Sequence, residues 1–184
     1  MRNAWTFVLI AGCGGDVGSA SDATPGGGSG EPAELAGMTL DHNQVRAGVA
    51  TSPALAPLQW DPQLAAYAAT WAAKCQDVDP PTGLIDHDPA RTGVAGYAYI
   101  GENIYASSGA ATAKDAVDSW ASEAAGYNPS TGNCDSGTCG HYTQIVWRTT
   151  THVGCALHDC PGLTYPSSIV CDYGPGGNSG GKAF

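Results

Sequence analysis

Charged residues are scarce in this chain, and basic residues are the scarcer kind. Lysine and arginine together number 7, against 17 aspartates and glutamates in 184 residues, so the formal net charge is −10. A surface of this kind repels a phosphate backbone instead of displacing its counterions. We therefore expect no nucleic-acid partner and no adsorption of the folded part to anionic membrane surfaces.

Long apolar runs and familiar catalytic motifs are missing as well. No run approaches the roughly 18 apolar residues that a membrane-spanning helix needs. The chain has no His-Glu-x-x-His helix, nucleophile elbow, P-loop or dinucleotide-binding glycine pattern. What is left after a leader and a linker is one domain of about 145 residues, enough to bury a core.

The chain has seven cysteines, an odd number, and the position of one of them explains why it is left without a pair. Cys13 stands alone near the N-terminus. The other six lie in the expected folded part and form three possible pairs, which is typical of an oxidising compartment. A zinc–thiolate site is the alternative, because two Cys-x4-Cys spacings also suit metal ligation. The six are Cys75, Cys134, Cys139, Cys155, Cys160 and Cys171.

The N-terminal residues have the pattern of an export signal. Arg2 precedes a short apolar stretch, residues 4–10, and Ile10-Ala11-Gly12-Cys13 resembles the bacterial lipoprotein processing box. Lipidation of Cys13 would explain the odd cysteine and would tether the protein to the cell envelope, in this reading a bacterial outer membrane. Ordinary secretion with loss of Cys13 is the alternative. We assign residues 1–13 to the signal peptide, 14–37 to a flexible Gly/Ser linker, and 38–184 to the folded domain.

Three helices follow from caps and apolar spacing. Thr39 is a candidate N-cap for a first helix that ends near Val49. Asp61-Pro62 combines a capping carboxylate with proline at the first helical position, and Cys75 lies on the apolar stripe of that helix. A third helix is expected from about Thr112 to Ala124.

Extended segments gather in the second half of the chain. We expect a short one over residues 102–106 and strands over 145–147, 153–157 and 168–173. Their alternation of polar and apolar residues is imperfect, which suggests that both faces of the sheet are covered. Helices before a late cluster of strands indicate an α/β fold of three layers.

Two titratable side chains stand out from the pattern. His141 follows Cys139 directly after one glycine and precedes the apolar run 145–147, so we expect a disulfide and a packed strand to hold it. Glu123 borders the apolar stripe of the third helix and therefore needs a partner, because burying a lone carboxylate costs on the order of several kcal/mol. The remaining candidates, taken singly, are more typical of structural residues; they are His42, His87, His152, His158 and Glu102.

Five motifs, in order, resemble the CAP superfamily of cysteine-rich secretory proteins, antigen 5 and plant pathogenesis-related class-one proteins. The resemblance spans about residues 38–180 and is nearest to the plant class. The motifs are His42-Asn43-x-x-Arg46, Leu58-Gln59-Trp60-Asp61, Gly101-Glu102-Asn103-Ile104, Gly140-His141-Tyr142-Thr143-Gln144-Ile145-Val146-Trp147 and Ile169-Val170-Cys171-Asp172-Tyr173.

The resemblance implies an α–β–α sandwich, the CAP fold, with a cleft lined by His87, Glu102, Glu123 and His141. It also implies the pairings Cys75–Cys160, Cys134–Cys139 and Cys155–Cys171. Asp172 and Gly176 depart from the family pattern, which commonly has asparagine and proline there.

Such a cleft favours a binding function over a catalytic one. Imidazoles beside carboxylates suit Zn²⁺, with Mn²⁺ or Ca²⁺ weaker candidates, and His87 and His141 would be the metal ligands. The alternative is a His–Glu network that only holds the shape of the cleft. We expect a non-enzymatic binding module for a lipid- or sterol-like ligand, a glycan or an extracellular protein. The competing functions are a metal-assisted hydrolase or peptidase that uses Glu102 and Glu123, and a structural envelope protein.

Overall fold

The structure is a computed structural model, and it describes residues 30–184. The predicted signal peptide, the processing box at Cys13 and linker residues 14–29 lie outside the described residues. Within residues 30–184, no helix has both the length and the apolar character needed to cross a membrane.

The described residues form six helical elements and eight strands. The helical elements are η1 (Ala33–Leu35), α1 (Met38–Ala47), α2 (Pro62–Ala72), α3 (Ala113–Ser122), η2 (Glu123–Gly126) and α4 (Gly140–Ile145). The strands are β1 (Gln59–Trp60), β2 (Thr92–Val94), β3 (Tyr97–Tyr99), β4 (Gly101–Ser107), β5 (Tyr127–Asn128), β6 (Asn133–Cys134), β7 (His152–Asp159) and β8 (Ser167–Gly174).

A four-stranded sheet, in the order β1-β7-β8-β4, forms the middle layer. β1 runs parallel to β7, and β7, β8 and β4 are antiparallel. Every residue of β8 is buried, so the expectation that both faces are covered is confirmed. β4 is an edge strand, with Glu102 opposite Asp172 and Asn103 opposite Cys171 on β8.

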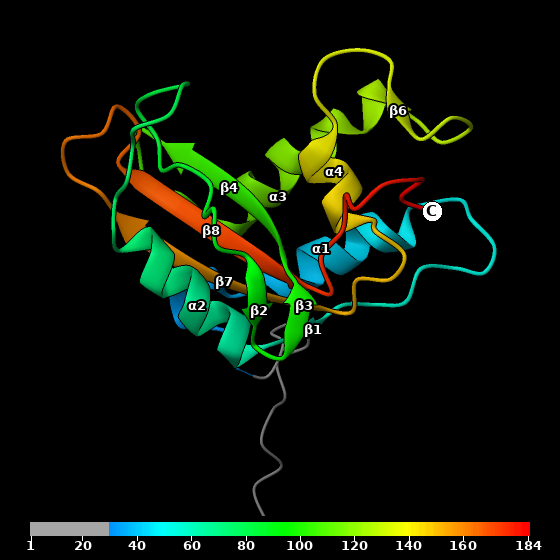
Figure 1. Cartoon of the computed structure of the whole chain (residues 1–184), viewed down its shortest axis with the longest axis horizontal. Helices are drawn as coiled ribbons and strands as arrows, with labels where there is room; N and C mark the ends of the chain where they lie inside the picture. Colours follow the sequence, from blue (N-terminus) through cyan, green and yellow to red (C-terminus); the bar gives the residue numbers. More distant parts are fainter. Residues whose placement is uncertain (1–29) are drawn as a thin grey trace, which may run out of the picture.

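Helices cover both faces of this sheet, as Figure 1 shows: α2 lies on one side, and α1, α3 and α4 lie on the other. Successive β8 residues alternate between the two layers, since Val170 packs in the cluster of α2 while Ile169 and Cys171 pack with the three helices. Gly154 lets α2 approach β7, because a Cβ there would collide with the helix backbone. The α–β–α sandwich is confirmed.

The three disulfides have the implied pairing: Cys75–Cys160, Cys134–Cys139 and Cys155–Cys171. The zinc–thiolate alternative is therefore wrong, because these sulfurs are bonded to one another. The first bridge joins the segment after α2 to the end of β7 across 85 residues, a loop long enough for a stabilisation of about 4–5 kcal/mol.

The strand expected over residues 145–147 is wrong. α4 ends at Ile145, and Val146 and Trp147 follow it as a turn in the core. A short apolar run does not distinguish a buried strand from a buried helix turn. Arg46 on α1, only 1% exposed, satisfies the freed backbone by donating hydrogen bonds to the carbonyls of Ile145 (2.7 Å) and Trp147 (3.0 Å).

The start of the fold also differs from the prediction. α1 begins at Met38 after Gly37, and Thr39 does not cap it; the Glu31 carboxylate instead accepts the N–H groups of Gly37 (2.9 Å) and Thr39 (2.7 Å). Leu35 is fully buried. Packed structure therefore begins within residues 30–37, which the composition had assigned to the linker.

The predicted cap at Asp61 is confirmed, and Thr112, the expected start of the third helix, is also an N-cap. The Asp61 carboxylate accepts the N–H groups of Gln63 and Leu64 at the start of α2, and the Thr112 hydroxyl accepts that of Asp115 in α3. The expected extended segment after Gly101 is also present as β4, which continues to Ser107. The long loop before it contains the β2–β3 hairpin, which the sequence did not predict.

Candidate functional site

Glu123 holds His141 in place. Its carboxylate accepts hydrogen bonds from the backbone N–H groups of His141 (2.9 Å) and Tyr142 (3.2 Å). It also accepts hydrogen bonds from Nδ1 of His141 (2.7 Å) and from the hydroxyl of Thr138 (3.1 Å). Cys139, at the N-cap of α4, gives no side-chain cap. One carboxylate therefore caps the helix and orients the imidazole. His141 and Tyr142 are the partners that Glu123 was expected to need.

The charge of Glu123 is stabilised by these contacts. Burial by itself raises the pKa of this carboxyl, but the hydrogen bond and positive charge of His141 and the two backbone N–H groups outweigh that effect. The net result is a pKa below its usual value. Glu123 is thus an ionised acceptor, and its side chain is 14% exposed.

Glu102 plays the same part for His87. The Glu102 side chain on β4 is fully buried, and its Oε1 accepts the Nδ1 of His87 (2.6 Å) and the N–H of Asp88 (3.0 Å). His87 comes from the loop between α2 and β2, and 53% of its side chain is exposed. The edge strand therefore fixes an imidazole that the loop alone would leave free.

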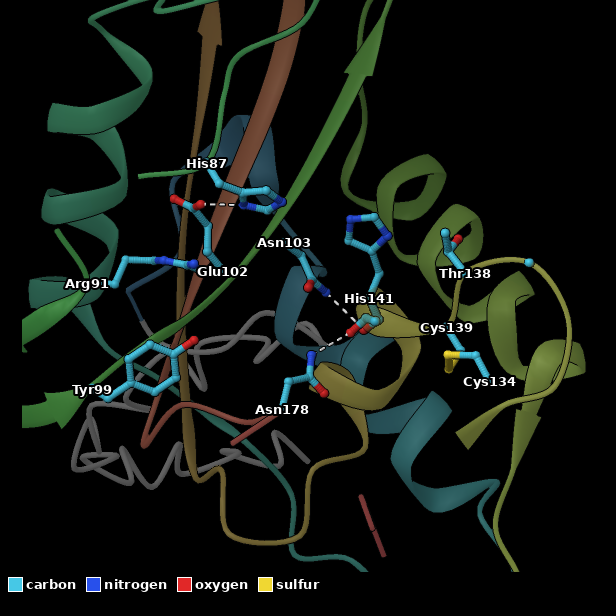
Figure 2. A pocket seen from close by; sticks show the side chains of 12 residues that line it. His87, Arg91, Tyr99, Glu102, Asn103, Cys134, Thr138, Cys139, His141 and Asn178 are labelled. Atoms are coloured by element: carbon cyan, nitrogen blue, oxygen red, sulfur yellow. Dashed lines mark hydrogen bonds and ion pairs between the residues drawn. A yellow bond between two sulfur atoms is a disulfide. The ribbon is translucent and has the colours of Figure 1, made fainter. Parts of the chain in front are cut away.

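The two imidazoles face each other across a hollow of about 550 Å³ (Figure 2). A carboxylate oxygen only accepts, so each Nδ1 carries a proton, and in the neutral form of either ring the lone pair is on Nε2. His87, Glu102 and His141 line the same hollow, and Glu123 lies behind His141. The four predicted residues are thus brought together as two His–Glu pairs.

The position of β4 at the edge explains why distant segments meet here. Glu102 points to the layer of α2 and the His87 loop, whereas Asn103 points to the opposite layer, where its Nδ2 donates to the carbonyl of His141 (3.1 Å) and to the hydroxyl of Tyr173 (3.1 Å). Asn178 in the C-terminal segment donates to the carbonyl of Gly140 (2.9 Å). Each of the two layers therefore places one imidazole beside β4: His87 from the side of α2, and His141 from the side of α4.

Sequence reasoning missed several residues of this cleft. Asn103 lay inside a quoted motif, directly after Glu102, but was given no role. Arg91 and Tyr99 also line the hollow, and the loop-like sequence around them carried no periodic signal. Asn178 also lines the hollow; it lies in the C-terminal segment, outside the five motifs.

The remaining histidines lie away from the cleft. His42 is fully buried, with Nδ1 bonded to the carbonyl of Met38 (2.7 Å) and Nε2 to the hydroxyl of Tyr173 (2.8 Å). Burial lowers the pKa of His42 to about 4, so it is a neutral structural residue. His152 and His158 both lie on β7.

One compact group of possible metal donors lies elsewhere in residues 30–184. Donor atoms of Cys75, His158 and Cys160 come within 4.8 Å of one another, whereas no such group of three forms at the cleft. Because Cys75 and Cys160 are joined in a disulfide, they are not thiolate ligands. The cleft therefore offers two imidazole nitrogens as donors, not a four-residue cage.

Neither glutamate is well placed as a general base. Glu102 is sealed from solvent, with one oxygen bonded to His87 and Asp88 and the other buried without a partner. Both oxygens of Glu123 accept two hydrogen bonds. A base must reach the proton it removes, so these hydrogen bonds leave neither carboxylate well placed for that role.

Asp172 is an unusual neighbour of Glu102. It faces Glu102 across the β4–β8 ladder, it is fully buried, and neither of its oxygens has a hydrogen-bond partner in residues 30–184. Burial, and then the negative charges of Glu102 and Asp88, raise the pKa of Asp172 to about 9. Asp172 is therefore a neutral acid at pH 7, where the resembling family commonly has the neutral amide asparagine.

The comparisons with known proteins agree with this fold. Residues 40–173 match the model of the CAP, or cysteine-rich secretory protein, family. The chain is 37% identical to pathogenesis-related protein 1 of Arabidopsis thaliana, over 74% of this chain and 73% of that protein. The chain belongs to the CAP family.

Other relatives are longer than this chain, and solved structures share its fold. The chain is 36% identical to GLIPR1-like protein 1 of Mus musculus over 74% of its own length but only 57% of that protein. Venom allergen-like protein 4 of Schistosoma mansoni superposes with a TM-score of 0.61 at 27% identity, covering 76% of this chain and 86% of that one. NaASP2, whose structure is described with Zn²⁺, gives 0.59 at 28%, covering 79% and 80%.

We predict that Glu123→Gln destabilises the fold and releases the imidazole. The amide keeps one acceptor oxygen but replaces the other with a donor, so the cap and the Nδ1 contact cannot both persist. We expect the free energy of unfolding to fall by about 2 kcal/mol, measured by denaturant titration. Imidazole NMR should show that His141 loses its fixed Nδ1–H tautomer. The control is Glu34→Gln on η1; equal effects of the two substitutions would contradict the assignment.

We also predict a pH-dependent gain from Asp172→Asn. The folded wild type keeps a proton on Asp172 that the unfolded chain releases above its ordinary pKa of 3.8. Wild-type stability should therefore fall by about 1.4 kcal/mol per pH unit from near pH 4 towards pH 9, relative to the asparagine variant. Unfolding measured at pH 4, 5.5 and 7 checks this, with Asp159→Asn as the control for loss of one negative charge. A variant that tracks wild type at all three values would refute it.

Proposed function

We propose that this protein is an exported, non-enzymatic binding module whose cleft holds a divalent cation between Nε2 of His87 and Nε2 of His141. The observation that carries the proposal is the matched pair of Nδ1–carboxylate bonds, at 2.6 and 2.7 Å. A carboxylate on Nδ1 fixes the tautomer and raises the basicity of Nε2, the arrangement that metal-ligating histidines in proteins commonly have.

Zn²⁺ suits this donor set best. Imidazole nitrogen is a good ligand for zinc, and two protein ligands leave coordination positions for water or for a group of a bound ligand. The net charge of −10 also attracts a cation. The zinc-containing structure of NaASP2, a relative at the level of fold and sequence, supports the choice by likeness.

The role that fits such a site is to hold a ligand without transforming it. Both carboxylates are occupied in orienting imidazoles, so the cation would act as an anchor for an oxygen atom of the ligand. An apolar or lipid-like ligand, a glycan or an extracellular protein remains the expected partner class.

We expect wild-type protein to bind Zn²⁺ with a stoichiometry of one, because only one imidazole pair lines the described cleft. His87→Ala and His141→Ala should each weaken binding about tenfold or more, since each removes one of two ligands. Isothermal titration of the three proteins measures this. His152→Ala is the matched control, with its histidine on β7 away from the cleft. Unchanged affinity in both cleft variants would eliminate the cation site.

Export carries a second proposal, which rests on the sequence. The three disulfides and the secretory character of the family agree with an oxidising location. We propose that Cys13 is lipidated and anchors the protein to a bacterial outer membrane. Mass spectrometry of the mature protein should find an acylated Cys13 at the N-terminus, and Cys13→Ser should release the protein from the membrane fraction. A mature chain that begins elsewhere would disprove the anchor.

A further inference from the structure

A group of three metal-ligating side chains lies away from the cation cleft. Donor atoms of Cys75, His158 and Cys160 all come within 4.8 Å of one another. Cys75 follows α2, while His158 lies on β7 and Cys160 comes directly after that strand. None of the three lines the hollow between the cleft imidazoles, so the proposed cation site does not explain this group.

His158 is the member of the group for which the disulfide gives no reason. Each of the other four histidines bonds a ring nitrogen to a carbonyl, a carboxylate or a hydroxyl, whereas His158 has no such partner in the described part of the chain. A bridge between two cysteines needs no imidazole beside it. In its neutral form the half-buried ring of His158 has a free lone pair next to the two sulfur atoms.

The backbone keeps both cysteines in place without help from the sulfur atoms. The N–H of Cys75 donates to the carbonyl of Ala72 (3.1 Å), and the N–H of Cys160 donates to the carbonyl of Pro166 (2.8 Å). Both cysteines also pack on the core cluster beneath α2, and their Cα atoms are 5.5 Å apart. The two side chains therefore stay close together when the bond between their sulfur atoms is open.

One ion can join all three donors. Metal–ligand distances of about 2.0 Å for nitrogen and about 2.3 Å for sulfur allow this, after small side-chain shifts, for donors within 4.8 Å of one another. Cys160 is fully buried, while Cys75 and His158 are half-buried. A cation can therefore reach the group from the side of Cys75 and His158.

The donor set selects a soft cation. The group has two sulfur atoms, one imidazole and no carboxylate, so Ca²⁺ and Mg²⁺, which take oxygen ligands, do not suit it. Thiolates favour Cu⁺ and Zn²⁺. Structural Zn²⁺ sites are almost always closed by four protein ligands, whereas Cu⁺ is satisfied by three. The three donors that the fold brings together therefore match Cu⁺ best.

We propose that the Cys75–Cys160 disulfide and a monovalent copper ion are alternative states of one site. A dithiol reductant transfers two electrons and two protons to the bridge, which becomes two thiols while the dithiol becomes a disulfide. Each thiol then releases its proton and binds Cu⁺ as a thiolate, and the neutral ring of His158 supplies the third ligand.

The copper form belongs to the chain before its bridge has formed, or after a dithiol has opened it. The ion links the segment after α2 to the end of β7, which are the segments that the disulfide joins. Because the ion requires the folded arrangement of its ligands, its binding stabilises the folded state of the reduced chain. This inference goes beyond the proposed function, since the two sites share no residue.

The test uses a parent protein, the full chain with Cys13→Ser, Cys134→Ser and Cys139→Ser, so that Cys75 and Cys160 are the thiols that a dithiol releases. The Cys155–Cys171 bridge is buried and should stay closed. Dithiothreitol opens the bridge without oxygen and is then removed, and a count of two thiols verifies the reduced state. Cu⁺ is supplied as its bicinchoninate complex. The reduced parent should withdraw one more Cu⁺ per chain than the oxidised parent.

Matched variants identify the third ligand. His158→Ala should weaken Cu⁺ binding by the reduced protein about tenfold or more, because it removes one of three ligands. His152→Ala changes another histidine of β7 and should leave the affinity within about twofold of the parent. X-ray absorption by the bound copper should show two sulfur ligands and one nitrogen ligand.

Three results would each overturn the inference: equal Cu⁺ uptake by oxidised and reduced parent, unchanged affinity in His158→Ala, or copper bound by sulfur alone. If the bridge resists the dithiol or the reduced parent unfolds, refolding of the reduced chain with and without Cu⁺ replaces the titration. Recovery of the native circular dichroism spectrum on addition of Cu⁺ in the parent but not in His158→Ala supports the site. Recovery in both proteins, or in neither, overturns it.

Discussion

The cleft depends on one carboxylate that does the work of a helix cap. Glu123, directly after α3, accepts hydrogen bonds from two first-turn N–H groups of α4, those of His141 and Tyr142, and from Nδ1 of His141. The two positions are coupled, because the N-terminus of α4 and the imidazole share one acceptor group. Free N–H groups and the partial positive charge at a helix N-terminus favour an anion there. The orientation of His141 is thus a consequence of how α4 begins.

On the other side of the sheet a second carboxylate, Glu102, also holds an imidazole by its Nδ1. β4 is the edge strand. As in any strand, its successive side chains point to opposite faces of the sheet, so they reach the helical layers on both sides. Glu102 holds His87 from the layer of α2, and Asn103 holds the backbone of His141 from the other. Asp172 contributes on the buried side as a neutral acid, which avoids placing two negative charges on facing residues of the ladder. The arrangement gives each imidazole a carboxylate partner on Nδ1.

Much of the fold was predictable from local patterns, and the errors share a cause. Asp61-Pro62 and Thr112 each specify a helix start through a side chain and backbone that are close in sequence. Thr39 looked like the same signal, but Glu31, eight residues away, supplies the cap. The run Ile145 to Trp147 looked like a strand, yet it ends a helix because Glu123 caps that helix from 18 residues upstream. A local sequence pattern does not show which distant carboxylate will accept the N–H groups at the start of a helix.

By itself the sequence determined the three-layer class of fold, an even set of domain cysteines and the need of Glu123 for a partner, because periodicity, counting and desolvation are properties of the chain alone. Family likeness supplied the disulfide pairing and named the four residues of the cleft. Only the tertiary structure decided that they form two separate His–Glu pairs, that Asp172 lies unpartnered opposite Glu102, and that Arg91 lines the hollow between the imidazoles. These relations depend on strand register and on loops packed against distant elements, and neither leaves a periodic trace in the sequence.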